Sequence, residues 1–262
     1  MTGSLFDLVV PTVGRPSLDL LLEALTSGRP VGAGQGPVPA GPLPGRLLLV
    51  DDRRGGEPLD PAVPAPLVAR TRVVRGRGAG PAAARNLGWR LASAPWVAFL
   101  DDDVVPDPGW LEALAVDLAG LGPGVAASQG RLRVPPPRDR RPTDWERNVS
   151  ALAGARWITA DMAYRRWVLA EVGGFDERFR RAYREDSDLA LRVLRAGWRI
   201  ERGRRTAAHP ARPAGPLVSV RLQAGNADDV LMRALHGPGW RAEAGAGRGR
   251  WGRHLATTLA GL

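Results

Sequence analysis

The chain has 262 residues, a formal net charge of +10 at pH 7 and 44% hydrophobic residues. This length is enough to bury a full hydrophobic core, and it is most simply one α/β domain with a tail. The sequence contains no cysteine, which excludes disulfide bonds, thiolate metal sites and a cysteine nucleophile.

The positive charge comes from arginine alone, since the sequence contains no lysine. Outside the runs at 138–141 and 202–205 the arginines are interspersed with Asp and Glu, as on an ordinary solvated face. We therefore expect no nucleic-acid partner. No apolar run has membrane-spanning length and the N-terminus has no signal-peptide pattern, which favours a cytoplasmic protein. Peripheral contact with the inner face of the membrane stays open.

Apolar runs predict buried strands over residues 6–10, 46–50, 71–75 and 96–100. Apolar residues at helical spacing predict helices over 18–25 and 81–93, and the Gly/Pro-rich stretch 28–45 predicts a surface loop. Strands that alternate with helices in this way are typical of a parallel, doubly wound sheet with right-handed crossovers.

The second half of the chain has a less regular pattern. We expect an irregular surface segment over 120–156, a strand-like stretch from 157 that turns into a helix up to 172, and a helix that begins at Glu185 and stops at Gly197. Asn226 or Asp228 is expected to cap a further short helix, with an apolar side formed by Val230, Leu231, Ala234 and Leu235.

Polar residues follow the predicted strands at the points where the strands end. Thr12, Asp51 and Asp52, the Gly-rich segment 76–85 and Asp101 to Asp103 all lie just beyond a strand. The carboxyl ends of parallel strands share one edge, and open α/β sheets bind their ligands at that edge. This coincidence predicts a ligand site there.

The acidic run of Asp101, Asp102 and Asp103 is the most informative of these segments. Carboxylates this close repel one another, and a hard divalent cation relieves the repulsion. A helix is expected directly after this run, with Asp107 as its N-cap and Pro108 as its first residue. The alternative interpretation of the acidic run is a turn-and-cap cluster on a solvated edge of the protein. A second acidic pair, Glu185 and Asp186, stands at a predicted helix N-terminus. The helix dipole stabilises carboxylates there, whether or not they also have a role in function.

Together these segments resemble the family 2 glycosyltransferases, from about Phe6 to His209. The residues that carry the resemblance are Val9 to Thr12, Leu49 to Asp52, Ala84 to Gly88, Phe99 to Asp103 with Pro106, Trp110 and Leu111, Gly173 to Glu177, and Glu185 to Leu189 with Arg192, Gly197 and Trp198. The resemblance implies the GT-A fold, a mostly parallel, Rossmann-like sheet flanked by helices. It also implies a catalytic domain over 1–215, with a nucleotide-binding half at about 1–105 and an acceptor half at about 106–215, and a helical C-terminal extension over 216–262.

The resemblance also implies roles for particular residues. The donor nucleotide is expected near Pro11, Thr12, Asp52, Arg85 and Asp102. Asp101 and Asp103 would hold Mn²⁺ or Mg²⁺ against the diphosphate, with His209 either a third ligand or a structural residue. Asp186, next to Glu185, would be the catalytic base, and Asp161 and Met162 are expected near the acceptor or the sugar.

The chemistry agrees with this assignment. A divalent ion neutralises charge on a leaving diphosphate, and a base on the opposite side of the anomeric carbon takes the acceptor proton, so a single displacement inverts the configuration. Gln223 to Asn226 does not form the Gln-x-x-Arg-Trp pattern of processive synthases, which favours one transfer to a discrete glycan, lipid-linked or small-molecule acceptor. Homodimerisation stays open.

Two other classes of protein remain as alternatives. A nucleotidyltransferase-like enzyme also combines an α/β sheet with acidic metal ligands, but it favours a Gly-rich loop with a lysine after the first strand, which Val10 to Pro16 lacks. An arginine-rich nucleic-acid binder leaves the acidic strand ends unexplained.

Overall fold

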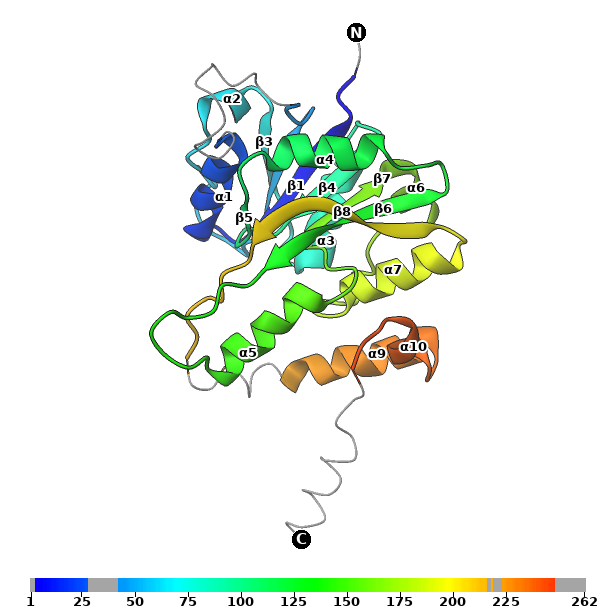
Figure 1. Cartoon of the computed structure of the whole chain (residues 1–262). Helices are drawn as coiled ribbons and strands as arrows, with labels where there is room; N and C mark the ends of the chain where they lie inside the picture. The colour runs from blue at the N-terminus through cyan, green and yellow to red at the C-terminus, as the bar shows by residue number, and fades with distance from the viewer. Residues whose placement is uncertain (1–2, 28–41, 216–217, 219–222, 248–262) are drawn as a thin grey trace.

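The computed structural model describes residues 3–27, 42–215, 218 and 223–247. Within these residues eight strands form one mixed sheet in the order β3-β2-β1-β4-β7-β6-β8-β5, and helices cover both of its faces (Figure 1). The α/β class expected from the sequence is confirmed.

The first half of the sheet is parallel, as predicted. Its strands are β1 (Phe6–Thr12), β2 (Leu47–Asp51), β3 (Thr71–Arg75) and β4 (Trp96–Leu100). The connecting helices are α1 (Ser17–Thr26), α2 (Ala65–Val68) and α3 (Pro81–Leu91). Because these four strands are parallel, their carboxyl ends share one edge of the sheet. The predicted loop over 28–45 lies outside the described residues up to position 41.

Side chains of these strands alternate between two buried cores. Val9, Leu48 and Phe99 pack on the face covered by α3, whereas Leu8 and Val10 pack on the face covered by α1. Because both faces are buried, the strands read as continuous apolar runs in the sequence.

The second half of the sheet is mixed, whereas the first half is parallel, which agrees with the expected mostly parallel sheet. Its strands are β5 (Val105–Pro106), β6 (Val125–Arg133), β7 (Asp161–Arg165) and β8 (Arg199–Ala208). β7 runs antiparallel to both β4 and β6, β8 runs parallel to β6, and β5 closes the edge antiparallel to β8.

The prediction of an irregular segment over 120–156 is wrong. It contains β6, the helix α5 (Asp144–Ser150) and the 3₁₀ turn η1 (Ala151–Gly154). α5 begins with a capping box in which Thr143 and Glu146 exchange hydrogen bonds with each other's backbone N–H groups. β6 escaped prediction because buried polar residues interrupt its apolar pattern: Gln129 accepts a hydrogen bond from the Trp157 N–H and donates one to the Ala155 carbonyl.

β8 escaped prediction because its central residue is a buried arginine. The Arg205 side chain is 0% exposed and is paired with Asp161 at 2.6 Å and with Asp117 at 3.1 Å. It also donates to the Ser128 hydroxyl, while the Trp110 indole N–H donates to Asp161. The guanidinium thus joins β8 to β6, to β7 and to α4 (Trp110–Ala119) by a network of charge-assisted hydrogen bonds.

α4 begins two residues later than the sequence suggested. Gly109, in the left-handed region with φ of 80°, precedes Trp110 as the N-cap, and Asp107 is not the cap. The Asp107 carboxylate instead accepts hydrogen bonds from Thr206 and Arg133, which fixes the pairing of β5 with β8.

The helices α6 (Arg166–Glu171) and α7 (Glu185–Arg195) lie on the same face of the sheet as α3. α9 (Asn226–His236) and α10 (Trp240–Glu243) lie along the outer side of α7 (Figure 1). The bounds of α7 confirm the prediction of a helix that starts at the second acidic pair.

The C-terminal helix is present but differs from the prediction in detail. Gly225 precedes α9, so neither Asn226 nor Asp228 is the cap. Met232 is fully buried in the core, whereas Val230, expected on the inner side, is 69% exposed. Residues 248–262 of the expected extension lie outside the described residues.

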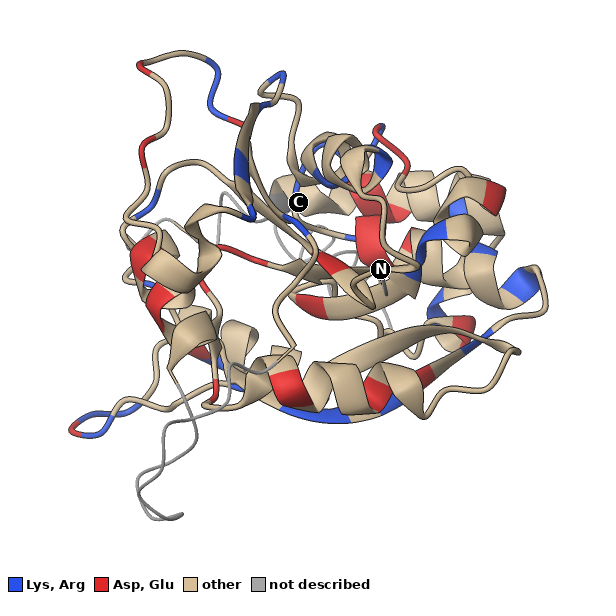
Figure 2. Ribbon diagram, turned by 90° about the horizontal axis from the view of Figure 1, so that it is seen from above, with Lys and Arg blue, Asp and Glu red and all other residues tan. Residues whose placement is uncertain are grey.

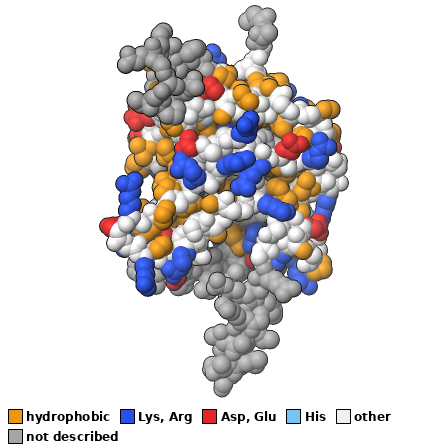
Figure 3. Space-filling view, in the orientation of Figure 1, with side chains coloured by type: hydrophobic (Ala, Val, Ile, Leu, Met, Phe, Trp, Pro, Cys, Tyr) orange, Lys and Arg blue, Asp and Glu red, His pale blue; other side chains and the backbone are white. Residues whose placement is uncertain are grey.

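Basic and acidic residues are interspersed on the surface. Figure 3 shows arginine side chains spread over one face with apolar and acidic side chains between them, and Figure 2 shows acidic residues at the centre of the ribbon as well as at its periphery. In the part of the chain that the structure describes, no helix combines the length and apolar character needed to span a bilayer.

Candidate active site

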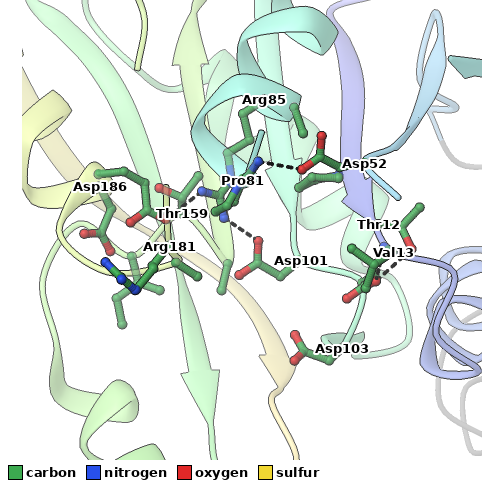
Figure 4. A pocket seen from close by; sticks show the side chains of 18 of the residues that line it. Thr12, Val13, Asp52, Pro81, Arg85, Asp101, Asp103, Thr159, Arg181 and Asp186 are labelled. Carbon is green, nitrogen blue, oxygen red and sulfur yellow. Dashed lines mark hydrogen bonds and ion pairs between the residues drawn. The ribbon is translucent and has the colours of Figure 1, made fainter. Parts of the chain in front are cut away.

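A cavity of about 420 Å³ opens at the carboxyl ends of β1, β2 and β4 (Figure 4). The acidic residues of both sequence motifs line it together with residues from α3, α5 and α7. The lining includes Pro11, Thr12, Asp52, Arg85, Asp101, Asp102, Asp103, Thr159, Glu185, Asp186, His209 and Arg212.

Asp102 links the ends of β1 and β4. Its carboxylate accepts hydrogen bonds from the Thr12 hydroxyl at 2.7 Å and from Arg15 at 2.6 Å. The backbone N–H of Val13 donates to the same carboxylate. Asp102 is 2% exposed, so most of its hydrogen-bonding capacity is used to hold the floor of the cavity.

Asp52 fixes the Gly-rich loop that precedes α3. Its carboxylate accepts the backbone N–H groups of Ala79 at 3.2 Å and Gly80 at 2.7 Å. Gly80 has φ of 101°, and a Cβ there would come within 2.3 Å of the Arg180 carbonyl oxygen. The loop can therefore pass under the segment before α7 only with glycine at this position.

Arg85 connects the two acidic motifs from the first turns of α3. The guanidinium is 2.6 Å from Asp101 and 2.8 Å from Glu185, and the residue is 2% exposed. A buried arginine bound to two carboxylates is a rigid, charged element of the cavity wall.

The environments of Glu185 and Asp186 differ. Burial, together with the neighbouring Asp186, raises the pKa of Glu185, while Arg85 opposes the shift. Burial also raises the pKa of Asp186, although hydrogen bonds from Ser187 and the charges of Arg85 and Arg184 oppose it. No salt bridge to Asp186 is found among the described residues, which leaves its carboxylate available to a ligand.

Asp103 lies on the other side of Asp101 from Arg85 in Figure 4 and is 8% exposed. One carboxylate oxygen is 3.5 Å from His209 Nε2 and the other is 3.0 Å from Arg212 Nε. Burial and the nearby Asp101 raise the pKa of Asp103, whereas His209 and Arg212 oppose this shift.

Four buried polar atoms of the cavity lining have no hydrogen-bond partner among the described residues. They are Arg85 Nε, Thr159 Oγ1, Glu185 Oε2 and His209 Nδ1. Buried polar groups in proteins nearly always have a partner, so their concentration in one cavity indicates a polar ligand.

The carboxylates and the imidazole of the cavity are potential ligands of a divalent metal ion. Among the described residues, no group of three or more Asp, Glu, His or Cys side chains is already arranged to hold a metal ion. Asp103 and His209 nevertheless lie close together, with Asp101 two residues away and an unpartnered His209 nitrogen beside them. Carboxylate oxygens such as those of Asp101 and Asp103 suit Mn²⁺ or Mg²⁺ when a ligand such as a diphosphate supplies further oxygens.

Nearly all of the site residues expected from the sequence come together in this cavity. Asp161 and Met162, expected near the acceptor or the sugar, are the exceptions, because neither lines the cavity. Met162 is 0% exposed in the core and Asp161 is bound to Arg205. The preceding residues, from Ile158 to Ala160, line the cavity instead.

The sequence analysis missed several basic and aromatic lining residues. They are Arg15, Arg180, Arg181, Arg212 and Trp145. Arg180 and Arg181 stand shortly before the acidic pair, which was the one available signal. Trp145 reaches the site only because α5 folds over it, and no local pattern reveals that.

Comparison with known proteins gives a family match over most of this site. The model of glycosyl transferase family 2 matches residues 43–185. This range is more than half of the chain and includes the Gly-rich loop, the acidic run and Glu185.

Two curated proteins are equally similar to this chain in sequence. The pre-mycofactocin glycosyltransferases of two strains of Mycobacterium tuberculosis are each 34% identical to this chain over 134 residues. The aligned part is 46% of this chain and 28% of each relative, so the chain spans less than a third of the length of the curated relatives it matches.

Two solved structures are similar to this chain. The mannosyltransferase PcManGT from Pyrobaculum calidifontis, solved in complex with GDP-Man and Mn²⁺, has a TM-score of 0.55 and 19% identity, over 98% of this chain and 79% of that chain. A crystal structure of S. aureus TarS has a TM-score of 0.47 and 14% identity, over 78% of this chain and 57% of that chain. The likeness to PcManGT confirms the GT-A arrangement of the sheet and helices. From the match over residues 43–185, this chain belongs to glycosyl transferase family 2.

Proposed function

We propose that this protein is a metal-dependent, inverting glycosyltransferase that moves a sugar from a nucleoside-diphosphate sugar to a hydroxyl of a discrete acceptor. The observation that carries the proposal is one cavity lined by the acidic run after β4, the partly buried Asp186 and unpartnered polar atoms. The GDP-Man bound to PcManGT and the glycosyltransferase names of the curated relatives support a sugar-nucleotide donor.

The donor nucleotide is proposed to lie along the ends of β1 and β2. Pro11, Thr12 and Asp52 line this side of the cavity, and Asp102 holds Thr12 in place. Arg85 supplies positive charge where the diphosphate would lie, and Glu185 fixes the orientation of its guanidinium at 2.8 Å. We therefore assign Glu185 to orienting Arg85 and leave the proton transfer to Asp186.

Asp103 and His209 would hold Mn²⁺ or Mg²⁺, with Asp101 beside them. When bound, the ion supplies Lewis-acid neutralisation of charge on the leaving diphosphate. Arg212 lies 3.0 Å from Asp103, and its positive charge opposes the rise in the pKa of this carboxylate that burial causes.

Asp186 is proposed as the general base. It accepts the proton of the acceptor hydroxyl as that oxygen forms a bond to the anomeric carbon, and the bond from this carbon to the diphosphate oxygen breaks. The two events occur on opposite faces of the sugar, so one displacement inverts its configuration and needs no covalent intermediate. In Figure 4 Asp186 and Thr12 lie on opposite sides of the cavity, which leaves room for a sugar between them.

The division of the chain follows from this arrangement as part of the proposal. Residues 1–215 form the catalytic domain, with a nucleotide half up to about 105 and an acceptor half from about 106, and 216–262 form an extension. A single glycan, lipid-linked or small-molecule acceptor would enter from the side of α5 and Arg181. A nucleic-acid partner fits poorly, because the carboxylates of the cavity would repel a polyanion.

Isothermal titration with nucleoside diphosphates tests the proposal through Asp103→Asn. We expect one of the nucleoside diphosphates UDP, GDP, dTDP or ADP to bind the wild type only with Mn²⁺ or Mg²⁺ present. The variant should bind it at least about 100-fold more weakly, since even residues behind metal ligands contribute roughly 10- to 100-fold to affinity.

Asp19→Ala is the control for this titration, because Asp19 is an exposed carboxylate on α1 outside the cavity. It should leave binding unchanged. Wild-type protein that binds none of the nucleotides, with or without metal, would reject the proposed function. Metal-dependent binding that survives in Asp103→Asn would reject only the assignment of the metal ligand.

A further inference from the structure

Arg184, the residue directly before Glu185 and Asp186, has an unusual backbone conformation. Its φ is 74°, and among the described residues only Trp157 shares a positive φ without being glycine. A residue with a Cβ is strained in this region, so the surroundings must hold it there. The conformation matters for the site, because it sets where the chain enters α7 and hence where the first residues of that helix point.

The side chain of Arg184 is held by the C-terminal helices. Its Nε donates a hydrogen bond of 2.7 Å to Asp229 on α9. The guanidinium also stacks on two rings, with its carbon 4.3 Å from the Tyr183 ring centre and 4.9 Å from that of Trp240 on α10. These contacts are the kind that fix an arginine in one orientation.

The partners of Arg184 are themselves anchored. Trp240 is 2% exposed and Met232, on the turn of α9 after Asp229, is fully buried, and both belong to the core under α7. Arg241 of α10 binds the second carboxylate oxygen of Asp229. The Asp229 carboxylate is therefore held in one position, and its hydrogen bond to Arg184 restrains the residue that precedes α7.

We propose that the unit formed by α9 and α10 is a working part of the active site, because its Asp229 and Trp240 clamp Arg184 and thereby place Asp186 in the cavity. Arg184 is a positioning residue in this proposal. The inference rests on the proposed role of Asp186, but it adds a segment beyond residue 185, where the family match ends. The charge of Arg184 also opposes the effect of burial, which raises the pKa of Asp186.

The same helices supply a matched control. At the other end of α7, Arg195 pairs with Glu243 of α10 at 2.9 Å. This ion pair docks the same unit against the same helix, but it lies away from the cavity. With a purely structural role of the C-terminal unit, loss of either contact would act through stability alone and leave kcat of the folded protein unchanged, whereas the clamp makes the contact at Asp229 matter for the reaction.

The test compares Asp229→Asn with Glu243→Gln in the full chain by hydrogen exchange and by kinetics. In Asp229→Asn the backbone amides of residues 184–188 should exchange faster, whereas Glu243→Gln should leave their exchange unchanged. Turnover is followed with water as the acceptor, as hydrolysis of the sugar nucleotide whose diphosphate binds in the titration above, and is measured as release of that diphosphate. We expect kcat to fall on the order of 100-fold in Asp229→Asn with the donor KM unchanged, the effect of a displaced catalytic group.

Two further variants keep the result interpretable. Asp229→Glu retains the carboxylate and should recover part of kcat. Arg184→Lys retains the charge but loses the guanidinium fork and the stacking, so it should lose kcat as Asp229→Asn does. It also serves as the test should Asp229→Asn fail to fold.

Equal effects of Asp229→Asn and Glu243→Gln on exchange and kcat would overturn the proposal, as would unchanged exchange at 184–188 in Asp229→Asn. Should the wild type turn over no donor, the proposed function fails. The exchange comparison still decides whether the clamp holds the start of α7, because it needs no substrate.

Discussion

Asp186→Asn is expected to lower kcat by about 100- to 10,000-fold, the usual contribution of a general base. Asparagine has nearly the same shape and can keep the contact with Ser187, but it cannot accept a proton. Binding of the nucleoside diphosphate and metal should be retained, because the nucleotide side of the cavity is built by Thr12 and Asp52. The measurement is the initial rate of diphosphate release, together with the titration of the diphosphate.

The pH dependence provides an independent check on Asp186. A base works only after it has lost its proton, so kcat should rise with pH as Asp186 ionises. Because burial raises the pKa of Asp186 above the ordinary value of 3.8, this rise should lie at higher pH than for an exposed aspartate. The residual activity of Asp186→Asn should lack this rise. A variant with wild-type kcat, or with the same acid limb, would show that another group takes the proton.

Arg205→Met is expected to lower the free energy of unfolding by about 3 to 5 kcal/mol, the cost of breaking a buried ion pair from one side. Methionine fills much of the same space, but it leaves Asp117 and Asp161 buried without their positive partner. Burial already raises the pKa of Asp161, and Arg205 is the main opposing influence. Urea unfolding followed by circular dichroism measures the loss.

The neighbouring Arg204 is the control for this variant. It lies on the same strand but is exposed, so Arg204→Met should change stability by no more than about 0.5 kcal/mol. Equal stability of the two variants would mean that the network around Arg205 contributes little. The comparison separates the effect of a buried charge from the effect of an arginine in β8.

The parallel half of the sheet could be predicted from the sequence because its strands are buried on both faces. Leu48 and Leu49 point to opposite cores, and each is apolar, so no polar residue interrupts the run. β6 and β8 lack this property. Their burial of Gln129 and Arg205 depends on partners more than 25 residues away, and such pairing leaves no local pattern.

Some residues of the site could be predicted from the sequence and others could not. The acidic residues could be predicted because they come directly after strands that share an edge, as Asp52 and Asp101 do. Asp161 lies outside the cavity, since its carboxylate is paired with the buried guanidinium of Arg205, and no local pattern reveals that pairing. The clamp on Arg184 could not be predicted, because it joins residues 45 positions apart through a side chain whose conformation the sequence does not show.

The antiparallel insertion of β7 has a consequence for how the chain acquires its structure. β4 is bonded to β1 on one side and to β7 on the other, with Phe99 opposite Met162. During synthesis, the apolar edge of β4 therefore stays open until the ribosome has released residue 165. An exposed apolar strand edge is the feature most prone to pair with another chain. A chain truncated before β7 would therefore expose the edge of β4 and be prone to self-association. Pairing of β4 with β7 completes the sheet and covers this edge.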